Sequence, residues 1–394
     1  MTGTLPHTPG RQARNARLAV CYFFVLLGVV TGVWAARIPA VKETVGLSDG
    51  QLSYGLLAIA AGLVIGMRFA GRLTDRLGSA RLMTPAAVLT ALAVIAPGYA
   101  TTLPVLIASL FCFGLVNASL DVSMNAHGVQ VERAYGRPLM SSFHGMFSVG
   151  GLLGAGIGAA FAWAGVAAGP TFAATAIPLA ALCLLARRGL LPSTPAPAEN
   201  RARPRRRVSW TARIALLGAV AFAGLVGEGA ANDWTAVYLH DHLAAAPGLA
   251  AVGFAVFSTA MTIGRLAGDG LAARLGPVRL VRWSGVTAAA GLGAALALPS
   301  VPLSIAGFAV FGLGLSTIVP LVFSAAGNDD PERAGEAIAQ VAMLGYSGLV
   351  LGPAIIGGAA ELAGLRIALT IPLALAVFMA ASAPALRGRR SPSE

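Results

Sequence analysis

The sequence predicts an all-α polytopic membrane protein whose twelve transmembrane helices form two parallel six-helix bundles. Three observations predict this fold: a series of apolar stretches, basic residues confined to every second gap between them, and an internal repeat. Each stretch is about 20 residues long, enough for a helix to cross about 30 Å of hydrocarbon. We place the twelve stretches at 18–36, 52–70, 82–100, 104–126, 139–163, 167–186, 213–238, 249–268, 280–298, 302–325, 337–360 and 366–386.

The composition agrees with a protein that is buried in lipid and has no soluble catalytic domain. The chain is 56% hydrophobic and only 11% charged, and its 49 glycines suit helices that approach closely in lipid. The three cysteines, Cys21, Cys112 and Cys183, all lie in apolar stretches, which favours packing thiols over a disulfide framework. The first stretch follows three arginines, and we expect a retained anchor because eleven further stretches come after it.

The basic residues indicate how the chain is oriented in the membrane. The net charge is +12, yet 25 Lys and Arg residues fall on the side of the N-terminus and only three, Arg37, Lys42 and Arg366, fall on the other. This asymmetry is the positive-inside bias of an inner (plasma) membrane protein with both termini in the cytoplasm. The charge is therefore topological, so we expect a lipid bilayer and no nucleic acid as partner.

The longest polar gap divides the chain into two halves. Its Pro and Arg content is typical of a flexible linker, which gives an N-terminal bundle at 1–186, a linker at 187–212, a C-terminal bundle at 213–386 and a tail at 387–394. The halves repeat at an offset of 198, as the matches Phe113-Gly114-Leu115 with Phe311-Gly312-Leu313 and Gly150 and Gly154 with Gly348 and Gly352 show. Six helices per half make the halves parallel, which is typical of transporters with a substrate site between two bundles.

The gap between the second and third stretches carries the most specific motif. It reads Gly71-Arg-Leu-Thr-Asp75-Arg76-Leu-Gly78-Ser-Ala-Arg81. This resembles the signature loop of the major facilitator superfamily, G-x-L-x-D-R-x-G-x-x-R, and with the twelve stretches and the repeat the resemblance covers the whole chain. The copy in the second half is degraded, since Ala273 stands where the motif has its acid.

The motif suggests a cytoplasmic gate made of Gly71, Asp75, Arg76, Gly78 and Arg81. The glycines permit a tight turn, and the carboxylate can latch onto a positive helix end. A suitable helix begins in the second half, where Asp330-Pro331-Glu332 reads as an N-cap followed by Pro at the first helical position. The alternative is a plain loop that obeys the positive-inside rule.

Three further segments are similar to a branch of this superfamily that includes the rhizopine-transport membrane proteins. The segments run from Leu120 to Gly128, from Gly136 to His144 and from Gly227 to Trp234. Rhizopines are amino-inositol compounds, so the resemblance implies a small polyhydroxylated solute as substrate.

The fourth and fifth stretches contain polar residues, which are costly in a membrane and therefore functional candidates. Asn117, Asp121 and Asn125 recur every four residues and share one face of a helix. Asp121 and His144 each lie 11.5 residues from the centre of the hairpin that joins the two stretches, so we expect them at similar depth on adjoining helices. Such a pair is suited to carry a proton; the alternative is a structural hydrogen bond between the helices.

The seventh stretch supplies Glu228, Asn232 and Asp233. Glu228 and Asn232 share a face, and Glu228 is the deeper of the acids, so it is the candidate of the second half for binding or protonation. We expect Asn232 and Asp233 in the substrate site, with Asp233 nearer the outer end.

The first and seventh stretches occupy equivalent positions in the internal repeat. In the superfamily that the chain resembles, these two helices flank the central cavity. We expect Arg37 to pair with Asp233 or Glu228 when the outer gate closes; the alternative is an arginine that snorkels to the surface. Trp34 and Trp234 offer flat faces to a sugar-like ring, although tryptophans of the interfacial belt have the same pattern.

The predicted function is a secondary active transporter that moves a small polar solute by alternating access, coupled to a proton held by Asp121, Glu228 or His144. The alternative is a proton-coupled antiporter that exports a drug or metabolite; a membrane enzyme and a non-transporting receptor are further rivals. The chain has no phosphate-binding G-x-x-x-x-G-K-[ST] loop, and its five histidines form no catalytic or metal-ligand set. We expect a monomer without metal or cofactor, driven by the proton gradient.

Overall fold

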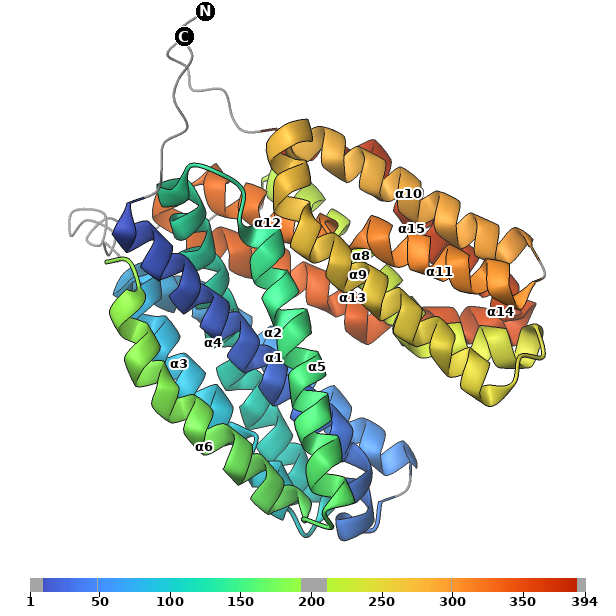
Figure 1. The fold of residues 1–394 in the computed structure, drawn as a ribbon, viewed down its shortest axis with the longest axis horizontal. Helices are drawn as coiled ribbons and strands as arrows, with labels where there is room; N and C mark the ends of the chain where they lie inside the picture. The colour runs from blue at the N-terminus through green and yellow to red at the C-terminus, as the bar shows by residue number, and fades with distance from the viewer. Residues whose placement is uncertain (1–9, 48, 193–210, 299, 388–394) are drawn as a thin grey trace, which may run out of the picture. The chain divides into compact units, whose positions relative to one another are not determined.

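The computed structural model describes residues 10–47, 49–192, 211–298 and 300–387, which form helices joined by short turns (Figure 1). All twelve predicted stretches are helical. Among the described residues, 11 helical segments are long and apolar enough to cross a membrane. The remaining stretch forms α9 (Pro247–Leu275), a helix of 29 residues that carries Arg265 and Asp269. Most of the predicted linker (193–210) and tail (388–394) lies outside the described residues.

The chain divides into two compact units. Unit 1 comprises Met1–Arg207 and Pro331–Ala339, and unit 2 comprises Val208–Asp330 and Gln340–Glu394. The helix α13 (Ala334–Ala363) therefore belongs to both, because its first turns, through Ala339, group with unit 1.

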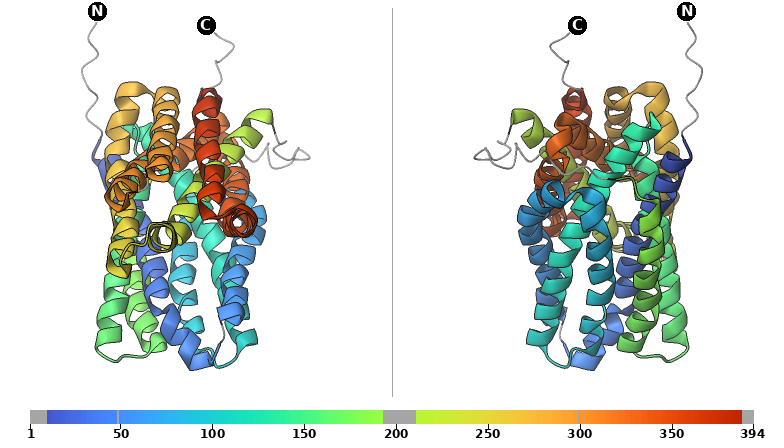
Figure 2. Two further views of the ribbon diagram at one scale, coloured as in Figure 1. Left: turned by 90° about the vertical axis from the view of Figure 1, so that its right-hand side faces the viewer. Right: turned by 90° about the vertical axis from the view of Figure 1, so that its left-hand side faces the viewer.

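Unit 1 is a bundle of six long helices with two short 3-10 turns. In Figure 1 and Figure 2 these helices lie side by side, with α1 against α5, α2 against α4, and α3 against both α4 and α6. The elements are α1 (Arg11–Val45), α2 (Asp49–Leu77), α3 (Ser79–Ala93), η1 (Ala96–Tyr99), α4 (Leu103–Tyr135), α5 (Met140–Trp163), α6 (Ala168–Ala186) and η2 (Arg187–Gly189).

Unit 2 repeats this plan with more interruptions. Its helix α10 packs on α11 and α15, α9 packs on α11, and α8 packs on α12 and α15. Besides α9, the elements are α8 (Ala212–Val237), η3 (Tyr238–His242), α10 (Pro277–Ala297), α11 (Val301–Leu315), α12 (Ile318–Asp329), the greater part of α13, α14 (Leu365–Ala368), α15 (Thr370–Ser382) and η5 (Ala383–Leu386).

The repeat found in the sequence corresponds to equivalent close helix contacts. A Cβ atom on Gly114 in α4 would overlap the carbonyl oxygen of Ile59 in α2. A Cβ atom on Gly312 in α11 would lie 2.6 Å from the carbonyl oxygen of Phe257 in α9. Ile59 and Phe257 are separated by the same 198 positions as the two glycines. In both units, therefore, the missing side chain lets two backbones touch.

One predicted stretch, 302–325, is not continuous. The α-helix stops after Leu315 and resumes at Ile318. Pro320 explains the interruption, because it has no N–H group to bond the carbonyl four residues earlier. The hydroxyl of Thr317, in the gap, instead pairs with that of Ser284 in α10 at 2.8 Å.

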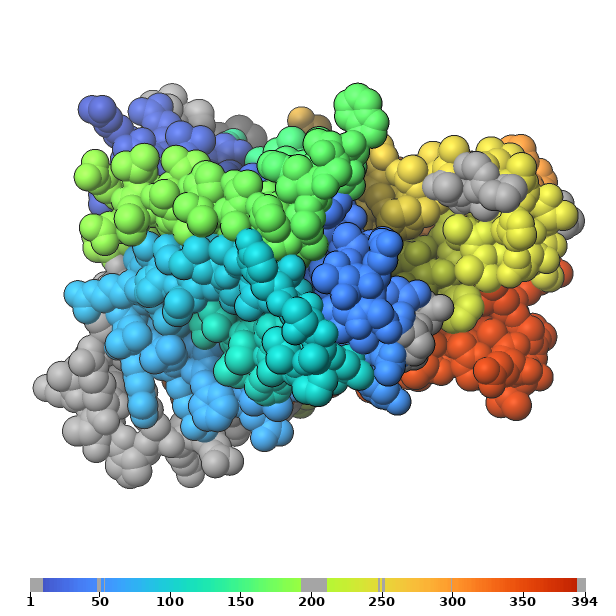
Figure 3. All heavy atoms as spheres, turned by 90° about the horizontal axis from the view of Figure 1, so that it is seen from below, coloured from blue at the N-terminus to red at the C-terminus, as the bar shows by residue number. Residues whose placement is uncertain are grey.

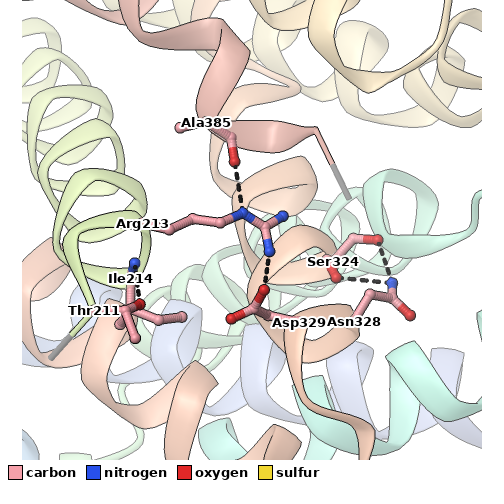
Figure 4. Close-up of polar contacts among 7 residues, drawn as sticks. All are labelled: Thr211, Arg213, Ile214, Ser324, Asn328, Asp329 and Ala385. Carbon is pink, nitrogen blue, oxygen red and sulfur yellow. Dashed lines mark hydrogen bonds and ion pairs between the residues drawn. The ribbon is translucent and has the colours of Figure 1, made fainter. Parts of the chain in front are cut away.

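Arg213, counted above as a topological charge, joins three helix ends of unit 2 (Figure 4). It lies at the start of α8 and pairs with the carboxylate of Asp329 at the end of α12. Its Nε also donates to the carbonyl of Ala385 in η5 at 3.0 Å. The side chain of Asp329 is only 6% exposed, so this ion pair is largely shielded from solvent and fixes the end of unit 2.

Candidate functional site

A buried hydrogen-bonded chain joins α4 to α5 in unit 1. The Nδ2 atom of Asn125 donates to the carbonyl of Asp121 at 2.8 Å and to its Oδ1 at 3.3 Å. The Oδ1 atom of Asn125 is 3.1 Å from Nε2 of His144. Asp121, Asn125 and His144 are 4%, 0% and 9% exposed. His144 therefore contacts Asn125, one helical turn along α4 from Asp121, and the expected equal depth of Asp121 and His144 stays a prediction.

The amide of Asn125 sets the direction of the hydrogen bonds between Asp121 and His144. Because the NH₂ group of Asn125 donates to the carboxylate, its oxygen is left to accept a hydrogen from His144. This arrangement suits an ionised Asp121 and an imidazole that carries a proton on Nε2. A change of charge at either end alters the strength of the bond that the amide makes there, so the two titratable groups are linked through one neutral residue.

Two contacts position the imidazole. The hairpin between the helices is fixed by Glu132, whose Oε2 accepts the N–H groups of Leu139 at 2.8 Å and Met140 at 3.1 Å at the start of α5. The ring of His144 then packs on Phe24 of α1, with ring centroids 5.2 Å apart. Sequence reasoning missed Glu132, although an acid just before a Gly-Arg-Pro turn and a helix start was a usable signal.

Asn117 lies one helical turn from Asp121 on the same face of α4. It is half-buried, and its Oδ1 atom is buried without a hydrogen-bond partner among the described residues. A polar atom in that condition is costly unless a ligand or water satisfies it. The face of α4 that carries Asn117, Asp121 and Asn125 is therefore polar over two helical turns.

A second ion pair of unit 2 joins the interior of α8 to the interior of α9. Nη2 of Arg265 is 3.0 Å from Oε2 of Glu228, and the side chains are 10% and 23% exposed. We counted Arg265 only as one of the basic residues in or flanking the cytoplasmic gaps, and its pairing with Glu228 was not predicted. The sequence did contain the signal, because Arg265 falls inside the stretch predicted at 249–268, where a guanidinium needs an acidic partner.

The other predicted substrate residues are in varied surroundings. Trp34 is buried and packs on Phe172 of α6, with centroids 5.9 Å apart. In α8, Asn232 and Asp233 are exposed, and Trp234 is half-buried with its indole nitrogen unpartnered among the described residues. Direct substrate contact by these four residues stays a prediction.

Arg37 is buried rather than at the surface. It is 5% exposed, and its Nη2 donates to the carbonyl of Val166 in the turn between α5 and α6. Its burial argues against the snorkelling alternative. The expected pairing with Asp233 or Glu228 stays a prediction, and in this structure Glu228 bonds Arg265.

Asp75 of the signature motif caps the first turn of α13. Its Oδ1 accepts the N–H of Gly335 at 2.9 Å, and its Oδ2 accepts that of Glu336 at 3.0 Å. The expected contact between the motif acid and this helix start is therefore present. The helical run begins, as expected, at Pro331 with a 3-10 turn, and the cap by Asp330 stays a prediction; Asp75 accepts N–H groups one turn later, where the α-helix begins at Ala334.

Two glycines make this cap sterically feasible. A Cβ on Gly71 would lie 2.9 Å from the carbonyl oxygen of Gly335, and a Cβ on Gly335 would lie 2.7 Å from Oδ1 of Asp75. Gly78 has a φ of +88° at the turn into α3, which a side chain would strain. Arg76 and Arg81 are exposed. The motif thus packs closely against the start of α13, and its role as a gate stays a prediction.

Comparison with known proteins places this architecture in a family. A family model described as Major Facilitator Superfamily matches residues 18–353. The "Uncharacterized transporter y4wD" of Sinorhizobium fredii is 36% identical over 368 residues, covering 92% of this chain and 96% of that protein. The "Membrane protein MosC" of Rhizobium meliloti is 30% identical over 379 residues, covering 95% and 90%.

Solved structures share the fold at low sequence identity. The transporter FucP in its outward conformation matches with a TM-score of 0.80 and 14% identity, covering 96% of this chain and 100% of that one. The proton:xylose symporter XylE matches with a TM-score of 0.77 and 13% identity, covering 95% of each chain. At these identities the likeness concerns the fold alone.

Proposed function

The chain belongs to the Major Facilitator Superfamily, and we propose that it is a proton-coupled symporter of a small polar solute. The family and the names of its relatives indicate a multi-pass membrane transporter with the superfamily fold, and not an enzyme. The finer proposal is that it lies in the inner membrane with both termini in the cytoplasm and takes up a sugar- or inositol-like solute by alternating access.

The chain Asp121–Asn125–His144 is the observation on which proton coupling rests. Its two ends are a carboxylate and an imidazole, both buried within a spanning bundle and linked by one amide. Ionisable groups are costly at that depth, and His titrates near physiological pH. We assign the proton to this chain rather than to Glu228, because the partner of Glu228 is an arginine, which keeps its charge at all physiological pH values.

The proposed solute is polar because the groups available to it are amides and charges. Asn117, Asn125 and Asn232 each offer donors and acceptors that match hydroxyl groups. FucP is named a fucose:proton symporter and XylE a proton:xylose symporter, which supports a polyol substrate together with the resemblance to MosC. We expect the protein to act as a monomer with no bound metal or cofactor.

Proton movement in proteoliposomes tests the proposal. An inward gradient of myo-inositol, an amino-inositol, L-fucose or D-xylose should alkalinise the outside in step with uptake of labelled solute. Asp121→Asn should abolish solute-driven proton flux, because an amide cannot take the proton. Asn125→Leu should also reduce it, because both titratable groups remain but their link is lost.

Asp241→Asn is the matched control, since Asp241 is an exposed acid outside the proposed site. Its flux should equal that of the wild type. Equal proton flux in Asp121→Asn and wild type would overturn the assignment of the proton. Proton release driven only by cationic drugs or metabolites would favour the antiporter instead.

A further inference from the structure

A cationic cavity of about 920 Å³ lies between α3 and α6 in unit 1. The two helices run side by side on the surface of the unit, where Figure 3 shows α3 in light blue and α6 in light green. Three arginines line the cavity: Arg81 from the first turn of α3, and Arg187 and Arg188 from η2, which directly follows α6. The cavity thus lies where both helices reach the arginine-rich end of the bundle.

A polar network fixes one wall of this cavity. After η2 the chain continues through Leu190, Leu191 and Pro192, which all line the cavity. Nε2 of Gln130 in α4 holds this segment by donating to the carbonyl of Pro192 at 3.0 Å. The hydroxyl of Ser79, at the start of α3, lies 3.3 Å from Oε1 of Gln130. The segment after α6 and the first turn of α3 are therefore both tied to α4.

The network continues to a histidine that the transport proposal does not use. Nδ1 of His127 is 2.9 Å from the hydroxyl of Ser79, and His127 is 0% exposed. The ring therefore anchors the first turn of α3, only two residues before Arg81. Hydrogen bonds from α4 therefore hold the walls of the cavity in place.

The lining combines positive charge with apolar surface. Its twelve residues include the three guanidinium groups and no acidic side chain. Most of the others are apolar, and Leu89 and Leu184 on the outer faces of α3 and α6 are 54% and 53% exposed. A guanidinium binds a phosphate through paired N–H groups, whereas exposed leucines beside it suit hydrocarbon.

We propose that this cavity binds an anionic phospholipid, with its phosphate among Arg81, Arg187 and Arg188 and its acyl chains along α3 and α6. Basic pockets between helices at the cytoplasmic side are suited to such headgroups. A soluble phosphate shares the charged part of this chemistry. It would leave the apolar lining unused, and for this reason we favour the lipid.

The internal repeat provides a control. Positions 198 residues after Arg187 and Arg188 are Ala385 and Leu386, so two of the three charges have no counterpart in the second half. Arg81 corresponds to Arg279, which is exposed in unit 2. Selective lipid binding should therefore depend on the arginines of unit 1 and not on charge in general.

Native mass spectrometry of the full-length protein in detergent tests the proposal. The probes are cardiolipin, phosphatidylglycerol and phosphatidylethanolamine, each added over a concentration series. We expect the two anionic lipids to bind more tightly than phosphatidylethanolamine. The double variant Arg187→Ala/Arg188→Ala should weaken their binding by about 25-fold, since each arginine near the headgroup contributes about fivefold.

The charge-matched double variant Arg274→Ala/Arg279→Ala should bind within about twofold of the wild type. The variant Arg187→Lys/Arg188→Lys keeps the charge and should retain most of the binding, which separates loss of the site from damage to the fold. Equal affinity of wild type and Arg187→Ala/Arg188→Ala, or equal losses in both alanine pairs, would overturn the proposal. Displacement of the lipid by inorganic phosphate at equal concentration would also overturn it, in favour of a soluble anion.

Discussion

Replacement of Asp75 by Asn tests the cap on α13. In an α-helix the first four N–H groups have no partner within the helix, and those of Gly335 and Glu336 are in this position because α13 begins at Ala334. The two oxygens of Asp75 accept one of them each. The Asp75→Asn variant keeps the shape of the side chain but replaces one acceptor by an NH₂ donor, which would then face an N–H group.

The cost of this change follows from the two bonds. A hydrogen bond to a charged group contributes about 1.5–3 kcal/mol, and the variant loses one such bond and leaves the other neutral. The favourable interaction of a negative charge with a helix N-terminus, about 0.3–1 kcal/mol, is lost as well. The total is about 2–4 kcal/mol, which corresponds to at least a 30-fold change in the equilibrium for opening the cap.

Hydrogen exchange measures this opening directly. In the wild type, the amides of Gly335 and Glu336 owe their protection to Asp75. In Asp75→Asn we expect the peptide that covers 331–339 to exchange at least about 30-fold faster, while peptides from the middle of α13 stay unchanged. Mass spectrometry after deuterium labelling of the detergent-solubilised protein resolves the two regions.

Arg76→Ala is the control, because it changes the charge next to Asp75 without removing an acceptor. Its exposed side chain should leave exchange at 331–339 within about twofold of the wild type. If Asp75→Asn exchanged at the wild-type rate, the carboxylate would not be what protects these amides. If both variants exchanged equally fast, the faster exchange would come from the change in local charge and not from loss of the cap.

Two further predictions concern contacts within single units. Either Glu228→Gln or Arg265→Gln alone should lower the free energy of unfolding by about 1.5–3 kcal/mol, because it removes one partner of a partly buried ion pair, whereas the double variant should recover most of the loss. Thermal unfolding in detergent measures both, and a simple sum of the two single effects would contradict the pairing. Gly114→Ala should cost roughly 3 kcal/mol in the same assay, since its Cβ has no room beside α2. Gly156→Ala, with nothing within 4 Å, should be tolerated, and equal losses would show that the close contact at Gly114 is unimportant.

The sequence was sufficient for features that depend on local composition. Span number, the two halves and the glycine matches such as Gly114 with Gly312 follow from hydropathy and spacing, because a lipid-embedded helix must be apolar over a fixed length. Features that depend on which side chain reaches which were less predictable. The helical face of Asp121 and Asn125 was predicted, but spacing cannot tell that the amide of Asn125 contacts His144.

Two contacts show where the limits of the sequence lie. Arg265 was counted only for its side of the membrane, although its place inside an apolar stretch called for a partner such as Glu228. The helix start at Asp330-Pro331 could be predicted from its local pattern, and the helical run does begin at Pro331. The acceptors for the N–H groups of Gly335 and Glu336 come from Asp75, 260 residues before Gly335, and only the resemblance to the signature motif pointed to a contact of that range.

The internal repeat separates residues that build the fold from residues that are candidates for function. Where the halves agree, as at Gly114 and Gly312, the shared residue serves helix packing. The polar positions disagree, since the counterparts of Asp121, Asn125 and His144 at an offset of 198 are Val319, Phe323 and Ala342. A bundle of the same plan is therefore formed without these polar groups, so its packing does not require them. A costly buried polar group that packing does not require is a candidate for function, and this argument selects the hydrogen-bonded chain of unit 1 as the first place to look for the transported proton.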